Sequence, residues 1–591
     1  RIRQAGCICF GNHDDFSFYH AQCGGEFFSD DGRTCAIDSP EGVKVLEFHN
    51  RMYEAMGGRD TWDRYAASAH APEELNPFGQ NKVGMSVEDD WVIYRVQQYS
   101  PDLELRIAPV PAPEGRSPIT TSTTGTIYMI PHNAREPEAA WDFIRFVNSP
   151  EGQLAYFEAM NEYAASKGRN QTFTGFKANR RVREALTRYA PTDPTLRAAY
   201  DEVKNILDHL VSIPVSPVSG LLRDETKRAV SRVTLGQMGP QQALADADRR
   251  VQEGLDFFYS REKLPMFQWR YVWLALTVLV LSAFALLAYR TRGERAYSAL
   301  QRHEHRMGVV FIAPWLVGLL VFIIGPMVFS MAMSFCDYDV IHPARFVGLK
   351  NYTWMFTRDP LFWKSLANTA FMVLALPLGM LVALGIALLL NTKVRGMSVY
   401  RTIFYLPAIT PAVATAVLWF ALLNPDGLIN TALEATVGQW FGWNAPAWLQ
   451  DPTWSKPAIV LMGLWGAGGG MILWLAGLQG IPPQLYEAAS IDGAGRIRQF
   501  FSITLPMLTP YLFFSFVVGI IAVFQIFAQA LILTQGGPAD STLFYVYYLF
   551  NNAFRYFKMG YASAQAWVLF VIVLALTLIQ WRLSKRWVHY G

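Results

Sequence analysis

Three adjacent acids and a pair of histidines are the residues whose types and spacing most directly suggest catalysis or metal binding. On a strand, Glu88 and Asp90 would share one face about 7 Å apart. Glycosidase carboxylates lie roughly 5–10 Å apart, but three consecutive acids (Glu88, Asp89 and Asp90) are also typical of a solvated strand end. His303 and His305 stand two apart on a predicted helix, where their side chains diverge. We therefore expect no catalytic residue and no metal site on this chain.

Cysteine is sparse and concentrated near the N-terminus. Cys7, Cys9, Cys23 and Cys35 lie in the first 35 residues, and Cys336 is far downstream. This distribution fits an oxidising compartment. Cys23 and Cys35 flank a predicted turn (SDDGRT), so a disulfide between them would close a short loop. Four cysteines allow three pairings, and free buried thiols are the alternative.

A polar stretch between two apolar ones, residues 479–506, has the composition of a docking element. PPQLYEAASI predicts a short helix with Glu487 near its start, where a carboxylate favours the helix dipole. DGAG predicts a sharp turn with a positive φ at Gly493. RIRQFFSI predicts a second helix, and Pro506 then begins the next apolar helix. A helix–turn–helix of this kind suits a groove on a partner protein.

The composition places this loop in a membrane protein. Hydrophobic residues make up 52% of the 591 residues and charged residues 17%, against about 25% charge in soluble domains. A net charge of +3 gives no reason to expect a nucleic-acid partner. A bilayer core of about 30 Å needs about 20 apolar residues in a helix. Seven stretches without Asp, Glu, Lys or Arg meet this length: 271–289, 308–335, 366–390, 403–423, 458–478, 507–533 and 562–581.

Loop charges predict the orientation of these spans. With the N-terminal part outside, the loops facing the cytoplasm carry 13 Lys and Arg in 68 residues, against 7 in 92 for the opposite loops. This asymmetry follows the positive-inside rule, so we expect an extracytoplasmic N-terminal domain and a cytoplasmic C-terminus. Export of that domain needs a signal segment. Because none precedes Arg1, we expect that it has been removed or that the sequence starts within a longer reading frame.

Residues 1–260 alternate amphipathic helical patterns with short strand-like runs. The helical patterns cover 39–56, 137–160 and 239–258, and the strand-like runs cover 83–87, 105–110 and 126–131. This alternation predicts an α/β domain.

Residues 12–258 resemble the later two-thirds of a carbohydrate-type extracellular solute-binding protein. CGGEFFSDDGRTCAIDSPEGVKVLEF, FGQNKVGMSVEDDW and TGTIYMIPHNAREPEAAWDFIRFVNSPEGQ carry the resemblance. The first lobe of that family has no counterpart here, so we expect an incomplete, periplasmic-binding-protein-like domain. By this resemblance Trp91 lies where the family stacks an aromatic ring on a sugar. The alternative is an ordinary core tryptophan.

Residues 302–591 resemble the permeases of ABC importers, in the branch that includes maltose and glycerol-phosphate transporters. The segments FVGLKNYTWMF, NPDGLIN, LTQGGPADST and GYASAQAW are typical of that branch. The loop matches the ATPase-coupling pattern of the family (EAA, then G, then I-x-L-P) at Glu487, Ala488, Ala489, Asp492, Gly493, Ile503, Leu505 and Pro506. The resemblance implies an α-helical polytopic membrane protein. Its six-helix permease would span 307–591, preceded by a linker, 261–306, with one additional membrane helix, 271–289.

Neutral amides in the predicted spans suit sugar hydroxyls, because each amide offers a donor and an acceptor. The substrate-binding candidates of this kind are Asn368, Gln525, Gln529 and Gln565. Hydrogen bonds between helices are the alternative for each of them.

These resemblances imply a membrane subunit of a carbohydrate importer in the bacterial inner membrane. It would work with a second permease subunit and with ABC ATPase subunits, and would carry its own substrate-capturing domain. Because the sequence lacks G-x-x-x-x-G-K-[ST], we expect no cofactor on this chain, and ATP and Mg²⁺ on the partner ATPase. The alternative is a membrane-bound sugar-sensing receptor that transports nothing.

Overall fold

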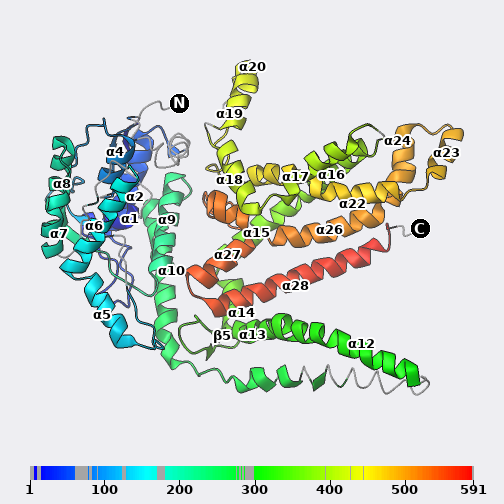
Figure 1. Ribbon diagram of the computed structural model, residues 1–591, viewed down its shortest axis with the longest axis horizontal. Coiled ribbons are helices and arrows are strands. Elements are labelled where there is room, and N and C mark those ends of the chain that lie inside the picture. The colour runs from blue at the N-terminus through cyan, green and yellow to red at the C-terminus, as the bar shows by residue number, and fades with distance from the viewer. Residues whose placement is uncertain are drawn as a thin grey trace. The chain divides into compact units, whose positions relative to one another are not determined.

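The computed structural model describes most of the chain in two compact units (Figure 1). The units are Arg1–Phe258 and Tyr259–Gly591. The described residues are 5–8, 15–59, 78, 81, 83–89, 91–122, 128–168, 173, 180–274, 276–278, 281–282, 285, 299–392, 394–425, 427–442 and 445–588.

The described residues of the first unit form helices and two short pairs of parallel strands. β1 (Ala5–Ile8) pairs with β2 (Val83–Ser86), and β3 (Thr120–Ser122) pairs with β4 (Leu210–Ser212). The α-helices are α1 (Asp15–Gln22), α2 (Pro40–Ala55), α4 (Val92–Tyr99), α5 (Pro137–Val147), α6 (Pro150–Ser166), α7 (Arg180–Leu186), α8 (Pro194–Ile206), α9 (Ser219–Thr234) and α10 (Pro240–Ser260). Short 3₁₀ turns are η2 (Thr187–Tyr189), η3 (Leu207–His209) and η4 (Arg261–Lys263), the last lying in the second unit.

Side-chain caps explain where several of these helices begin. Ser39 accepts a hydrogen bond from the Gly42 amide at the start of α2, and Asp193 caps α8 in the same way. Ser149 caps α6, with Pro150 in its first turn. The single helix predicted over 137–160 is therefore wrong, because this cap and proline end α5 and start α6.

Two of the predicted strands are also wrong. Residues 105–110 form no strand, because Leu105 packs in a cluster with α4 and α8, in which Tyr200 is fully buried. Residues 128–131 of the predicted strand 126–131 form no strand either, and 126–127 lie outside the described residues.

The predicted Cys23–Cys35 disulfide is absent, since both thiols are free. Cys35 is buried, and its backbone amide donates to Gln252 Oε1 of α10 at 2.7 Å. Burial raises the pKa of the Cys35 thiol, which keeps it protonated and unreactive.

The second unit is almost entirely helical. Its elements before residue 450 are α12 (Ala299–Gly318), η5 (Leu319–Ile324), α13 (Gly325–Ser334), β5 (Cys336–Asp337), β6 (Arg345–Phe346), α14 (Lys350–Thr357), α15 (Pro360–Val373), α16 (Leu376–Leu390), α17 (Met397–Ile409), α18 (Ala412–Leu422), α19 (Leu428–Leu433), η6 (Glu434–Gly438) and α20 (Gln439–Phe441). Those after it are α21 (Ser455–Trp465), α22 (Gly468–Gln479), α23 (Pro483–Ile491), α24 (Arg496–Gln499), η7 (Phe500–Thr504), α25 (Leu505–Met507), α26 (Thr509–Phe524), η8 (Ala530–Thr534), α27 (Tyr545–Phe550), η9 (Asn551–Arg555) and α28 (Met559–Ser584).

Three helical stretches among the described residues are long and apolar enough to cross a membrane. They are Val310–Ser334, Pro360–Leu390 and Met559–Ser584. Three bent pairs raise the number to six if each pair is one span: α17 with α18 (95°), α21 with α22 (48°), and Arg496–Met507 with α26 (62°). Six of the seven predicted stretches overlap these spans. The seventh, 271–289, is helical at its described residues.

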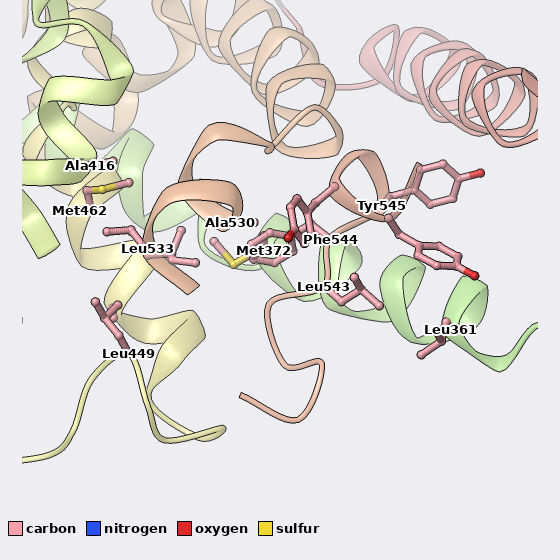
Figure 2. Packing of buried hydrophobic residues seen from close by; sticks show 14 of the residues in the cluster. Leu361, Met372, Ala416, Leu449, Met462, Ala530, Leu533, Leu543, Phe544 and Tyr545 are labelled. Carbon is pink, nitrogen blue, oxygen red and sulfur yellow. The ribbon is translucent and has the colours of Figure 1, made fainter. Parts of the chain in front are cut away.

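Two large apolar clusters lie among the described residues of the second unit, besides a smaller one around Cys336. One joins α15, α18, α21, η8 and α27, with Met372, Ala416, Met462, Leu533 and Phe544 among its members (Figure 2). The other joins α16, α22 and the start of α26. At Gly468 the helices approach so closely that an added Cβ would lie 1.8 Å from the Phe404 carbonyl oxygen, so only glycine fits there.

The two ends of this unit carry different structures. Figure 1 shows α23, α24 and the C-terminal end of α28 at one end, and β5 and α27 at the other. The first end carries the candidate docking loop.

Candidate functional site

The candidate docking loop is a helix–turn–helix, as the sequence predicts. α23 covers Pro483–Ile491, and α24 begins at Arg496 and continues through a π-helical turn, η7. The second helix does not stop before Pro506, as predicted, but runs to Met507 and bends by 62° into α26. A π-wound turn before Pro506 accommodates a residue that has no N–H to donate.

Gly493 closes α23 in the left-handed conformation, with φ +78°. Its amide donates to the Ser490 carbonyl at 3.1 Å, and the Ala494 amide donates to the Ala489 carbonyl at 2.8 Å. This pattern is a left-handed helix end. An added Cβ at Gly493 would meet no atom within 4 Å, so its backbone conformation alone favours glycine.

Side chains on the inner face attach the loop to the permease unit. The Tyr486 hydroxyl lies 2.9 Å from Thr504 Oγ1, and Tyr486 and Ile503 pack on the apolar cluster of α16 and α22. Across the turn, Gln499 donates to Ser490 Oγ at 2.9 Å and to the Ala494 carbonyl at 3.0 Å. These bonds hold the two helices in one arrangement.

The loop also exposes four apolar side chains. Ile491 is 86% exposed and Ile497 77%, and Leu485 and Phe501 are also exposed. Large exposed apolar groups on a braced polar loop are typical of a protein-docking surface. We call these four residues the docking face. These four residues were not among the predicted site residues, although apolar residues in a short polar loop are a signal visible in the sequence.

Glu487 is exposed on α23, but it lies further from the helix start than the predicted interaction with the helix dipole requires. Pro483 begins the helix, so Glu487 falls in the second turn, where the helix dipole has little effect. Its charge is therefore available to a partner surface.

At the other end of the unit, the chain just before the linking helix adds to the β5–β6 hairpin. Met266 bridges Arg345, the Phe267 amide donates to the Ala344 carbonyl at 2.8 Å, and the Phe346 amide donates to the Pro265 carbonyl at 2.9 Å. The segment thus forms an edge strand of the hairpin.

A buried ion-pair cluster fixes this edge strand. The Arg261 guanidinium lies 2.9 Å from Asp337 Oδ2 and donates to Asp339 Oδ2 at 2.5 Å. His342 Nδ1 lies 2.7 Å from the same Asp339 oxygen. Burial raises the pKa of Asp339, but hydrogen bonds from Arg261 and His342 outweigh it and lower the pKa to about 2. We call Arg261, Asp337, Asp339 and His342 the clamp.

Two of the four amides predicted to contact substrate form hydrogen bonds within the protein. Asn368 is buried and donates to the Asp540 and Leu543 carbonyls at 2.7 and 3.2 Å, which favours its structural alternative. Gln565 is fully buried, and its Oε1 accepts from Asn552 at 3.3 Å. Gln525 and Gln529 flank the break between α26 and η8.

Trp91 is 51% exposed, so the alternative of an ordinary core tryptophan is wrong. It lies at the start of α4 beside the Tyr94 and Phe173 rings, at centroid distances of 5.3 and 6.4 Å. An exposed ring supported by two others is a suitable platform for a sugar face.

Two of the three neighbouring acids, Glu88 and Asp89, lie in the part of the chain that the structure describes. β2 ends at Ser86, so Glu88 and Asp89 are loop residues, and Arg95 pairs with them at 2.6 and 3.2 Å. Asp90 lies outside the described residues. Among the residues that the structure describes, no three His, Cys, Asp or Glu could hold a metal ion.

Comparison with known proteins relates both units to transport systems. Residues 375–589 match the family of binding-protein-dependent transport system inner membrane components, and residues 5–179 match the bacterial extracellular solute-binding proteins. The probable ABC transporter permease protein YesP of Bacillus subtilis is 44% identical over 294 residues, which are 49% of this chain and 94% of YesP. The chain belongs to the ABC transporter permease family.

Two further similarities concern the same half of this permease. The lactose transport system permease protein LacF of Rhizobium radiobacter is 33% identical over 49% of this chain and 97% of LacF. The crystal structure of a bacterial ABC transporter involved in alginate import is 24% identical with a TM-score of 0.43, over 49% of this chain and 99% of that one. The permease joins an inner-membrane domain of sugar-transport type to a solute-binding domain on one chain.

The structure brings the coupling candidates of this permease together on one loop. Glu487, Ala488, Asp492 and Gly493 are exposed around the turn, whereas Ile503, Leu505 and Pro506 lie partly buried in the returning helix and Ala489 is partly buried in α23. The first group is available to a partner and the second supports it.

If the Trp91 ring stacks on a sugar, Trp91→Ala should weaken binding of that sugar by about 1–3 kcal/mol, the scale of burying one aromatic face. Calorimetric titration of the full-length permease in lipid nanodiscs with a panel of oligosaccharides measures the affinity. Trp141→Ala is the matched control, since Trp141 is 53% exposed on α5. Equal affinities of the Trp91 variant and the control would rule out a stacking role.

Proposed function

We propose that this permease is a subunit of an ATP-driven carbohydrate importer and that its N-terminal domain is a tethered, extracytoplasmic substrate-capturing domain. The observation that carries the proposal is the braced loop 483–507, which exposes Leu485, Ile491, Ile497 and Phe501. An apolar face of this kind needs a partner to bury it.

The partner that fits this loop is a separate ABC ATPase. The match to the coupling pattern of the family supports this choice, together with the positive φ at Gly493. ATP and Mg²⁺ would bind to that ATPase. A second permease subunit would complete the pathway, since the family works as assemblies of this kind.

Carbohydrate is the substrate class that the relatives support. Similar permeases are named for transport of lactose and of sn-glycerol-3-phosphate, and one solved structure is described as an importer of alginate. On this chain, the exposed Trp91 is the residue best suited to such a substrate.

The clamp gives the tether a physical basis. Arg261 follows α10 directly in the sequence, and within the second unit its ion pairs hold it to Asp337 and Asp339. Tethering makes the second encounter intramolecular, with an effective concentration in the range of about 1 mM. Substrate would then be delivered without release of the binding domain.

A sugar-sensing receptor is the competing function, and co-purification separates the two. The importer should bring down an ABC ATPase and a second permease from its native membranes. A chain that is purified with neither would support the receptor and contradict the importer.

The proposed orientation predicts an asymmetric labelling pattern. The labelling uses a variant of the protein in which the native cysteines have been replaced. In this background Ala198→Cys, exposed on α8, should react with a membrane-impermeant maleimide in intact spheroplasts. Gly495→Cys, exposed in the docking loop, should react only after permeabilisation. Labelling of position 495 in intact spheroplasts would reverse the orientation.

A further inference from the structure

A basic site lies between α15 and α21, at the ends of two apolar spans. Lys364, Asn368 and Phe371 are spaced four and three residues apart on α15, so they share one face of that helix. Lys456, in the first turn of α21, reaches the same face. Its ammonium donates to Asn368 Oδ1 at 3.1 Å and lies 5.0 Å from the centre of the Phe371 ring. We call these four residues the basic site.

Asn368 is oriented for this contact by the backbone around it. Its amide nitrogen donates to the carbonyls of Asp540 and Leu543, so its oxygen is directed to Lys456. The loop that supplies these carbonyls has left-handed backbone at Ala539 (φ 47°) and Asp540 (φ 56°). The amide therefore has one orientation, which fixes the position of the ammonium.

The charge of this site is not compensated by the described residues. Neither Lys364 nor Lys456 forms an ion pair with a carboxylate in the part of the chain that the structure describes, and the two ammonium groups repel each other. Lys456 is also partly buried. Partial burial of a cation beside a like charge costs free energy unless an anion offsets both charges.

Besides its positive charge, the basic site offers hydrogen-bond donors and an aromatic ring to a ligand. An ammonium has three donors, and Asn368 uses one donor of Lys456. Phe371 is 43% exposed, so its ring offers apolar area beside the Lys456 ammonium. A carboxylate carried on a sugar ring matches this combination, because the carboxylate accepts from the lysines while the C–H face of the sugar packs on the ring.

We propose that the basic site binds the negatively charged group of an acidic saccharide as it enters the permease. This inference rests on the proposed importer function and names the substrate class. In the proposed orientation the site faces outward, because Lys364 and Lys456 end the outer loops that precede spans 366–390 and 458–478. The phosphate of a lipid headgroup has the same charge, and the experiment distinguishes the two sources.

Reductive labelling with pyridoxal 5′-phosphate tests the site on the full-length permease in phosphatidylcholine nanodiscs. This aldehyde carries a phosphate, and pyridoxal serves as the reagent without one. Mass spectrometry gives the ratio of the two labelling rates at each lysine. Lys167 is the matched control, since it is exposed and also lies over one aromatic ring, Tyr163, at 5.6 Å.

We expect the rate of labelling by pyridoxal 5′-phosphate, divided by the rate of labelling by pyridoxal, to be higher at Lys456 than at Lys167. Lys364→Gln should lower the ratio at Lys456 by about three- to tenfold, the effect of removing one charge near the membrane surface. Digalacturonate or glucuronate should protect Lys456, and galactose should not. Equal ratios at Lys456 and Lys167, no effect of Lys364→Gln, or protection by neither acidic sugar would each overturn the proposal.

A second set of nanodiscs contains phosphatidylglycerol. If this anionic lipid protects Lys456 and the acidic sugars do not, the site binds a lipid headgroup and the saccharide assignment is wrong. Labelling requires no ATPase. A failure of the importer assignment would instead appear in the co-purification experiment, so the two failures are distinguishable.

Discussion

Gly493→Val should abolish most uptake while the protein still inserts and still binds its sugar. The left-handed φ of +78° costs a residue that has a Cβ about 1–2 kcal/mol, and more when the residue is β-branched. Because α24 follows this turn directly, a changed φ would redirect the docking face. Uptake and substrate-stimulated ATP hydrolysis in proteoliposomes with the partner subunits should fall together.

Gly495 supplies the control for this variant. Gly495 lies in the same turn, also has no atom within 4 Å of an added Cβ, and has an ordinary φ of −69°. Gly495→Ala should therefore transport normally. Full uptake in the Gly493 variant would contradict the coupling assignment and the importer with it.

Charge reversal tests the same surface independently of the backbone. Glu487→Lys should weaken ATPase docking by about 1–3 kcal/mol, because it places a cation where the partner receives a carboxylate. Gln484→Lys adds the same charge on an exposed position of α23 and should have a smaller effect. If both variants co-purify with as much ATPase as the unchanged protein does, the loop is only a connection between spans.

Arg261→Ala should open the clamp. Removal of the guanidinium leaves Asp337 and Asp339 as neighbouring buried carboxylates, and breaking a buried ion pair costs about 3–5 kcal/mol. Amide hydrogen exchange of the full-length permease reports this locally. We expect exchange at Phe267 and Phe346, whose amides join the edge strand to the hairpin, to accelerate by about a hundredfold or more.

Lys263→Ala is the matched control, since Lys263 is exposed in the same 3₁₀ turn. In this variant, the Phe267 and Phe346 amides should exchange their hydrogens at the same rate as in the unchanged protein. Slow exchange in the Arg261 variant would mean that the strand pairing, and not the ion pairs, holds the segment.

The clamp also predicts a pH dependence. The pKa of Asp339 falls from 3.8 to about 2 on folding, so its contribution to stability is complete above pH 4 and is lost as the pH falls towards 2. Burial raises the pKa of Asp337, which acts in the opposite direction. In the unchanged protein, the Phe267 and Phe346 amides should lose protection from hydrogen exchange as the pH falls from 4 to 2. Asp339→Asn should remove this pH dependence, measured by amide hydrogen exchange after brief exposure to acid.

Local sequence signals were sufficient to predict most of the helical stretches of the second unit and the helix–turn–helix of the docking loop. The apolar stretches overlap the membrane-capable helices, because span length depends on composition within one segment. The turn at Gly493 was predictable for the same reason, since a helix end depends on its own few residues. Helix breaks such as the one at Ser149 were missed, although the cap and Pro150 were visible in the sequence.

The sites that depend on distant contacts were not predictable from local pattern. Nothing in the sequence places Arg261 against Asp337 and Asp339, which lie 76 and 78 residues away and meet only through the edge-strand pairing. For Asn368 the sequence left a substrate contact and a hydrogen bond between helices as alternatives, and its actual partner is a loop more than 170 residues away. Composition and short-range periodicity thus predicted the membrane-capable helices and the helix–turn–helix of the docking loop. The burial and partners of each charged or amide group were decided only by folding, because the free energy of such a group depends on which distant atoms replace its water.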